Sequence, residues 1–321
     1  MRKLIVLVAV LAGLYAGYWA LGAMALRQGS EAALAQARAR GWADAEAVSL
    51  AGFPSRFDLT LTAPRLRSPD GQLEWSAPAA QALALSYQPN AVIVWAAPEQ
   101  ELRIGPQIFA FKNDDMRASV RAGLTPDLPL ALASLVIKAP RLTPEGMASG
   151  AEAAELRASM AALEGGTAPS YRVGFELSDL ALPAEISTDT VGRVFLDGIA
   201  QFAAPLDRHA AEATPRPLAL EVSSAQLLWG ERRLDAEGRL TVAADGTPEG
   251  TINLRLGNWR SWLAEAEAQG LVDPKRMPML ESIGQMMAQQ SGDGSVPLPL
   301  VFNAGQMRLG PVPLGPAPRL F

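Results

Sequence analysis

The sequence predicts an α+β protein, rich in β-structure, in which an N-terminal transmembrane helix precedes a curved, mainly antiparallel sheet with amphipathic helices packed on it. Three observations lead to this fold class. The chain begins with a long uncharged apolar run. Most of the remainder consists of short segments in which apolar and polar residues alternate, and two late segments carry apolar residues at helical spacing.

Composition limits the range of functions. The 321 residues suffice for one large or two ordinary domains, and 49% of them are apolar, enough for a sizeable core. The net charge is −5 and no basic run occurs, so nucleic acid is not an expected partner. The absence of cysteine excludes disulfides, thiolate metal sites and cysteine nucleophiles. His209 is the only histidine, which excludes sites with several histidine ligands.

Residues 1–27 are predicted to form a transmembrane anchor. The stretch Leu4–Leu26 has no charged residue and, as a helix, would extend about 35 Å, more than the roughly 30 Å of a bilayer core. Arg2 and Lys3 precede it, which favours a cytoplasmic N-terminus and a body outside the cytoplasm. Aromatic residues suited to a membrane interface occupy its second half: Tyr15, Tyr18 and Trp19.

The same segment has a second interpretation, a cleaved signal peptide. Ala23-Met24-Ala25 fits the small-x-small cleavage pattern. The apolar run is longer than the core of about 7–15 residues that signal peptides carry, so we favour the uncleaved anchor. The sequence by itself leaves both open.

Residues 28–50 are predicted to be a membrane-proximal helix and linker, and residues 51–321 a β-rich body. The body opens with a strand at 56–66, in which Phe57, Leu59 and Leu61 alternate with polar residues. We expect Leu59 and Leu61 to be buried, and Thr60 and Thr62 on the opposite face. Turn residues then separate further strands of an antiparallel meander, at 72–76, 82–87, 91–95, 101–104, 107–111 and 116–122.

The middle of the chain mixes strand and helix patterns. Strands are predicted at 129–142 and 171–179, and amphipathic helices at 152–163 and 189–202. The segments DLPLALASLVIKAPRL (127–142) and RPLALEVSSAQLLW (216–229) are alike. This similarity suggests that the body holds two strand-rich units, 51–142 and 216–321, joined by a helical segment.

The last third repeats the strand pattern and then carries the two late helices. Strands are predicted at 218–229, 233–243, 250–257, 296–303 and 306–309, before a proline-rich tail. Asn258 is expected to cap a helix through Gln269, and Asp273-Pro274 to start a second helix. These helices carry more apolar residues than one narrow stripe needs, so the candidate lipid-contacting residues are Trp259, Trp262, Met277, Leu280, Met286 and Met287.

The sequence lacks the common motifs of catalysis and cofactor binding. The sequence contains no GxSxG, GxxxxGK[ST], HExxH or Rossmann glycine pattern. His209 is expected in a loop, and the run Asn113-Asp114-Asp115 is expected to be a solvated turn rather than a calcium site. We therefore expect no enzyme activity, no catalytic or metal-ligating residue and no cofactor.

Several segments together resemble known envelope proteins. The anchor, the Gly52-Phe53-Pro54 strand start, GRLTVAADGTPEGTINLRLGNW (238–259) and FNAGQMRLGPVPLGPAPRL (302–320) resemble AsmA-like proteins. Over nearly its full length, the chain resembles a proteobacterial domain-of-unknown-function family, number 2125. The resemblance implies an inner-membrane protein with a periplasmic β-rich body, related to proteins linked to phospholipid traffic and outer-membrane assembly.

These inferences lead to three functional hypotheses. The first is a non-catalytic, inner-membrane-anchored periplasmic protein that binds or transfers a phospholipid or another hydrophobic ligand, or assists envelope assembly. The second is a structural envelope protein with a filled core that binds a protein partner and no ligand. The third is an uncharacterised enzyme. A continuous apolar groove would favour the first over the second, and buried polar groups converging in a pocket would favour the third.

Overall fold

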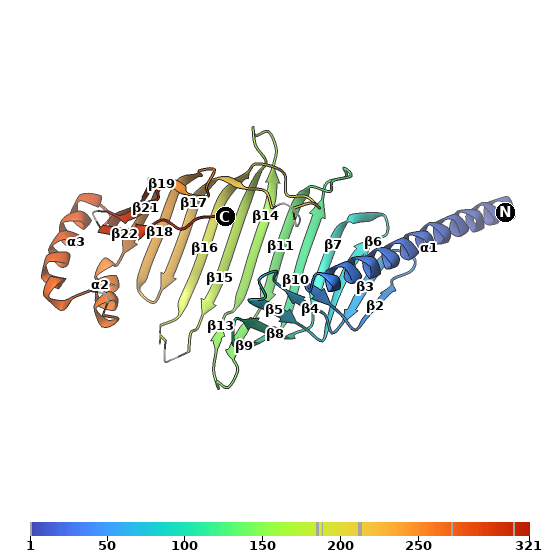
Figure 1. Ribbon diagram of the computed structural model, residues 1–321, viewed down its shortest axis with the longest axis horizontal. Coiled ribbons are helices and arrows are strands. Elements are labelled where there is room, and N and C mark those ends of the chain that lie inside the picture. The colour runs from blue at the N-terminus through green and yellow to red at the C-terminus, as the bar shows by residue number, and fades with distance from the viewer. Residues whose placement is uncertain (1, 184–185, 188, 211–213, 271, 311) are drawn as a thin grey trace. The chain divides into compact units, whose positions relative to one another are not determined.

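The computed structural model (Figure 1) describes residues 2–183, 186–187, 189–210, 214–270, 272–310 and 312–321. The chain divides into two compact units. Unit 1 comprises Met1–Leu124 and Ala133–Ala151, and unit 2 comprises Thr125–Leu132 and Glu152–Phe321. Antiparallel strands dominate both units, which confirms the predicted β-rich α+β fold with an N-terminal helix.

Unit 1 begins with helix α1 (Arg2–Ala39), which runs without interruption through the predicted anchor and the predicted membrane-proximal helix. Among the described residues, it is the single helix long and apolar enough to cross a membrane. The predicted linker after it is instead structured, because it forms strands β1 (Ala43–Asp44) and β2 (Ala47–Ala51). Helix α1 packs against both strands.

The larger group of strands in unit 1 forms an antiparallel series. Its members, in spatial order, are β2, β3 (Arg56–Thr62), β6 (Ala79–Leu85), β7 (Gln88–Ala96) and β10 (Asp115–Ala122). Leu59 pairs with Ala82 and Leu61 with Ala80, so these apolar residues share one face, as predicted. The expected burial of Leu59 and Leu61 is only partial, because both remain half-buried.

A smaller sheet forms from the intervening hairpins. Its order is β1, β4 (Arg65–Arg67), β5 (Leu73–Ser76), β8 (Glu99–Ile104), β9 (Gln107–Lys112), β12 (Arg141–Pro144) and β13 (Ala151–Glu152). The buried amide of Gln100 accepts from the Trp75 indole (Nε1 to Oε1, 2.6 Å) and donates to the Ala97 carbonyl (2.9 Å). Both ends of this buried polar group are therefore satisfied.

Unit 2 is a meander in which each strand pairs with the next along the chain. The strands are β14 (Glu155–Leu163), β15 (Ser170–Leu180), β16 (Val191–Phe202), β17 (Pro217–Trp229), β18 (Arg232–Val242), β19 (Pro248–Gly257), β20 (Val296–Asn303), β21 (Gln306–Leu309) and β22 (Val312–Pro316). Strand β22 lies in the proline-rich tail, of which Pro311 is outside the described residues. Strand β11 (Leu130–Lys138) contributes residues to both units.

Two predicted helices are wrong. Residues 152–163 and 189–202 contribute β14 and β16, so strands occupy the segment expected to join two units by helices. Both sequences satisfy two periods at once. Leu156 and Met160 are four apart, as on a helix face, but Ala158 between them also fits a two-residue alternation. Strand β14 lies between β11 and β15, and β16 pairs with β15 and β17. Hydrogen bonding to strands on both sides therefore favours the strand conformation of these two segments.

The two late helices are confirmed as α2 (Trp259–Ala268) and α3 (Met277–Ser291), with a short 3-10 turn η1 (Pro274–Arg276) before α3. They contact each other and strands β18 and β20. Asp273 caps η1 by accepting from the Lys275 N–H (2.9 Å). Asn258 does not cap α2 with its side chain, which instead donates to the Glu231 carbonyl on the neighbouring hairpin (3.3 Å).

Candidate functional site

One face of the unit 2 sheet carries an extended apolar surface. The cross-strand pairs define three parallel rows across β14–β20, the third of which continues onto β21, and every position in them is occupied by an apolar residue or glycine. We name these residues the apolar face. The rows are Leu156, Leu177, Val194, Leu227, Leu234, Leu256 and Val296; Ala158, Phe175, Leu196, Ala225, Ala236, Leu254 and Leu298; and Met160, Val173, Gly198, Val222, Gly238, Ile252, Leu300 and Leu309.

The opposite face of the same strands is polar and carries ion pairs between neighbouring strands. Arg172 pairs bidentately with Asp197 (2.8 and 2.9 Å), and Arg193 pairs with Glu176 (2.8 Å). The hydrogen bond from Arg172 holds the pKa of Asp197 below its usual value. On β18, the hydrogen bond from Arg233 likewise lowers the pKa of Asp235. The sheet is therefore amphipathic, with water on one side satisfying its charges.

The apolar face is not sealed from its surroundings. Within its three rows only Val296 and Gly198 are buried, and the other side chains are half-buried. Helices α2 and α3 contact β18 and β20, and Figure 1 shows them beside the late strands of unit 2 rather than over β14–β17. The apolar face is therefore the candidate site for a ligand, a partner or a lipid.

The six residues predicted to contact lipid do not come together in one cavity. Trp259 is buried against α3, where a Cβ on Gly284 would lie 2.7 Å from its ring, so it holds the two helices together. Trp262 donates to the Arg233 carbonyl (3.2 Å) and meets the Trp229 ring edge-on at 6.3 Å.

The four predicted lipid-contacting residues of α3 lie in two different environments. Met277, Leu280 and Met287 are half-buried, whereas Met286 is exposed. The cavities described below are lined by other residues. The late helices therefore contribute a packed helix pair with some exposed apolar surface, while the more extensive apolar surface lies on the sheet.

Arg232 fastens α2 to the end of the sheet. It is 5% exposed, donates to Asp189 Oδ2 (2.6 Å) and pairs with Glu265 of α2. Its guanidinium also lies 4.1 Å from the centroid of the Trp229 ring. Two carboxylates and an aromatic face together compensate for the burial of this charge.

Unit 1 contains an apolar cavity of about 370 Å³ between α1 and the sheet. Its lining is Tyr18, Gly22, Leu26, Phe57, Leu59, Ala82, Ala84, Pro89 and Val92. The helix is held there by hydrogen bonds from Tyr18 to the Ser86 carbonyl (2.7 Å) and from Trp19 to the Arg56 carbonyl (2.8 Å). Gly22 permits the close approach, because a Cβ there would lie 2.9 Å from Phe57 Cζ.

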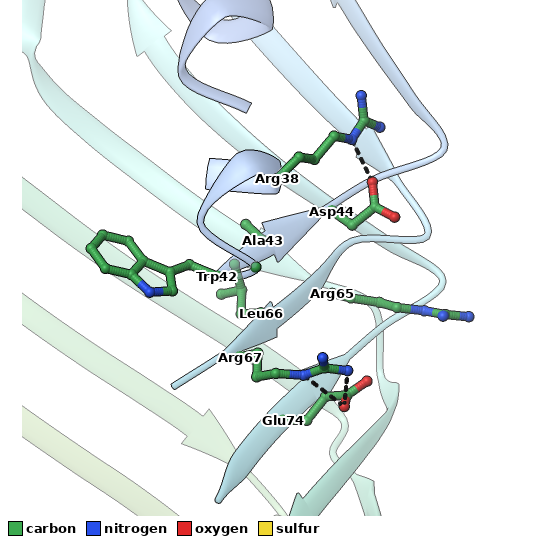
Figure 2. A pocket seen from close by; sticks show the side chains of 9 residues that line it. Arg38, Trp42, Ala43, Asp44, Arg65, Leu66, Arg67 and Glu74 are labelled. Carbon is green, nitrogen blue, oxygen red and sulfur yellow. Dashed lines mark hydrogen bonds and ion pairs between the residues drawn. The ribbon is translucent and has the colours of Figure 1, made fainter. Parts of the chain in front are cut away.

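Two further cavities are polar. The one in Figure 2, about 430 Å³, lies where α1 ends, and its charges are largely paired: Arg38 with Asp44 (2.5 Å) and Arg67 with Glu74 (2.8 Å). The hydrogen bond from Arg38 lowers the pKa of Asp44. The other, about 440 Å³, lies on the polar face of unit 2 and includes Arg233.

The two residues considered as catalytic or calcium-binding candidates, His209 and Asn113, make ordinary hydrogen bonds with their neighbours. His209 is exposed and accepts from Arg208 Nε (3.1 Å). Contrary to the expectation of a solvated turn, Asn113 is buried in unit 1, where it donates to the Pro98 carbonyl (3.4 Å). Within the described ranges of the chain, no group of three or more histidine, aspartate or glutamate side chains could hold a metal ion.

Comparison with known proteins gives a family and no relative of known function. No curated protein and no solved structure is significantly similar to the chain. The model of a bacterial family, described as uncharacterized protein conserved in bacteria (DUF2125), matches residues 19–318. Because this match covers nearly the whole sequence, from the middle of α1 to just beyond β22, the chain belongs to the DUF2125 family.

Proposed function

We propose that this protein binds the acyl chains of phospholipids on the apolar face of unit 2, as a non-catalytic, membrane-anchored component of the bacterial envelope. The observation that carries the proposal is the apolar face itself: three rows of apolar side chains, half-buried, on a sheet whose other side is charged. A sheet face of this kind needs an apolar cover, and acyl chains supply one without a defined shape.

The dimensions of the face suit acyl chains. From β14 to β20 each row crosses six strand spacings, or about 29 Å at roughly 4.8 Å per spacing. One leaflet of a bilayer core is about 15 Å thick, so the face can hold about two chains end to end. Acyl chains taken from a bilayer are already out of water, so the gain comes from the apolar face itself, at about 25 cal/mol per Å² of its surface that the chains cover.

Helix α1 supports a location of this binding beside a membrane. Helix α1 is long and apolar enough to span a bilayer, and Arg2 and Lys3 at its start favour a cytoplasmic N-terminus. We therefore propose that the body of the protein lies in the periplasm and is anchored to the inner membrane through α1. The resemblance to AsmA-like proteins supports the same location and a role in lipid traffic or envelope assembly. Alkaline phosphatase fused after Leu66 should be active, and an inactive fusion would contradict this orientation.

The central experiment compares neighbouring residues on the two faces of β19. Leu254 belongs to the apolar face and is half-buried, whereas Asn253 points to the polar face and is exposed. The detergent-extracted protein should carry phospholipid in native mass spectrometry. Leu254→Asp should lower the lipid occupancy several-fold, and Asn253→Asp should leave it unchanged.

Two outcomes would count against lipid binding. If the folded wild-type protein carries no lipid above the level of the detergent blank, the apolar face needs a protein partner, as in the second hypothesis. If Leu254→Asp remains folded and retains full lipid occupancy, the lipid binds elsewhere. Circular dichroism on the same samples separates loss of lipid from loss of fold.

A further inference from the structure

We infer that one end of unit 1 is immersed in the membrane interface, beside the helix that spans the bilayer. Four exposed apolar side chains mark this end, and we name them the apolar rim: Phe53, Leu85, Tyr87 and Leu124. The inference rests on the proposed anchoring by α1 and goes beyond it, because an anchor alone could leave unit 1 entirely in water.

The strand pairing places the rim residues at the same end of the sheet. Arg56 at the start of β3 pairs with Leu85 at the end of β6, so the loop holding Phe53 lies beside the turn holding Tyr87. On the other side of β7, Ala91 pairs with Arg121 near the end of β10, two residues before Gly123-Leu124. The Asn90 side chain also donates to the Ala122 carbonyl (2.8 Å).

Helix α1 meets the strands of unit 1 at this same end. The Tyr15 hydroxyl lies 2.9 Å from Ser86 Oγ, and the Tyr18 hydroxyl donates to the Ser86 carbonyl (2.7 Å). Trp19 contacts Phe53 edge-on, with ring centroids 5.2 Å apart. Figure 1 shows the N-terminal part of α1 projecting beyond the strands of unit 1.

The length of this projecting part decides the depth of the rim. Arg2–Leu14 precedes the contacts, and 13 residues of helix extend only about 20 Å, whereas a bilayer core is about 30 Å thick. A spanning α1 must therefore place residues up to about Gly22 within the hydrocarbon, including those in contact with Ser86 and Phe53. The apolar rim then lies in the outer part of the leaflet that faces the body of the protein.

The chemistry of the rim fits this position. The exposed fractions are 59% for Phe53, 70% for Tyr87 and 88% for Leu124, which would be unfavourable in water. Trp19, three residues before the outer edge of the hydrocarbon at Gly22, lies close to the headgroup region that aromatic residues favour. Tyr18 and Pro89, which lie at the same end of the sheet as the apolar rim, also line the apolar cavity of unit 1. One end of this cavity is therefore at the same depth as the rim.

The absence of cysteine allows a direct test with single-cysteine variants of the full chain. Tyr87→Cys and Leu124→Cys report on the rim, Leu11→Cys on the span, and Met147→Cys, an exposed residue of unit 1 away from the rim strands, is the control. Each is labelled with an NBD fluorophore and reconstituted in phosphatidylethanolamine–phosphatidylglycerol vesicles that contain lipids with a doxyl quencher at a shallow or a deep position.

The inference predicts strong quenching of labels 87 and 124 by the shallow doxyl lipid, blue-shifted NBD emission, and little quenching at 147. If label 11 is quenched by the deep doxyl lipid while 87 and 124 behave as 147 does, the anchor stands and the immersion of the rim is refuted. If label 11 escapes lipid quenching as well, the proposed anchoring fails, and the inference fails with it.

Discussion

Removal of the buried charge of Arg232 tests how unit 2 holds its helices. The variant Arg232→Gln loses the donors to Asp189 and Glu265 and the guanidinium over Trp229, because the shorter amide cannot reach both carboxylates. A hydrogen bond to a charged group contributes about 1.5–3 kcal/mol, and a partly desolvated cation–π contact about 0.5–2 kcal/mol.

The solvent exposure of Asp189 and Glu265 decides how much of the free energy of unfolding is lost in Arg232→Gln. The side chains of Asp189 and Glu265 are 52% and 30% exposed, so water can solvate both carboxylates after the substitution. No charge is left buried and unpaired, and the low end of each range applies. We expect a loss of about 2–4 kcal/mol, equivalent to a fall of about 5–15 °C in Tm for a unit of this size.

The neighbouring residue supplies the control. Arg233 is also paired, with Asp235 at 2.6 Å, but its side chain is 56% exposed. Arg233→Gln should therefore cost less than about 1 kcal/mol. Thermal unfolding of the full chain in mild detergent, followed by far-UV circular dichroism, measures both. Equal shifts in Tm for the two variants would refute the assignment of Arg232 as a buried link between α2 and the sheet.

Two further predictions concern α1 and the polar face. Gly22→Leu should weaken the docking of α1 by about 1–3 kcal/mol and lower the Tm, because a side chain at this position collides with Phe57. The control Gly13→Leu should leave the Tm unchanged, because no atom lies within 4 Å of a Cβ at Gly13. Similar Tm shifts in both variants would mean that α1 does not dock through Gly22. The lowered pKa of Asp197 means that its pairing with Arg172 stabilises the protein above pH 4 and that this contribution disappears as the pH falls through the lowered pKa. Tm measured from pH 6 to pH 2.5 should therefore drop less steeply in Arg172→Gln than in the wild type, and identical profiles would contradict this role of the pair.

Local sequence signals identified much of the architecture. The uncharged run at the N-terminus predicted a helix, and α1 includes all of it. Alternation of apolar and polar residues predicted most strands, including the facing of Leu59 and Thr60 in β3. The Asp273-Pro274 pair predicted the start of a helical segment, which is the capped η1 turn. Each of these signals depends on interactions between residues close together in the sequence, so the amino-acid sequence alone is enough to identify each signal.

The errors arose where two periods coincide. Residues 155–163 and 191–202 have apolar residues that fit both a helix stripe and a strand alternation. The same ambiguity hid the apolar face, because two of its strands, β14 and β16, were assigned as helices and the rows were interrupted. The late helices therefore carried the clearest apolar excess in the sequence, although Trp259 is packed inside the helix pair.

The sequence by itself determined that an apolar N-terminal helix precedes a β-rich body, and that amphipathic strands separate wet from dry side chains. Tertiary structure decided which strands neighbour one another and in which register, and hence that Phe175, Leu196 and Leu254 belong to one surface. It also decided that α1 meets unit 1 as early as Tyr15, too soon for its preceding part to span a bilayer alone. Both features depend on contacts between residues far apart in the chain, and local periodicity carries no information about such contacts.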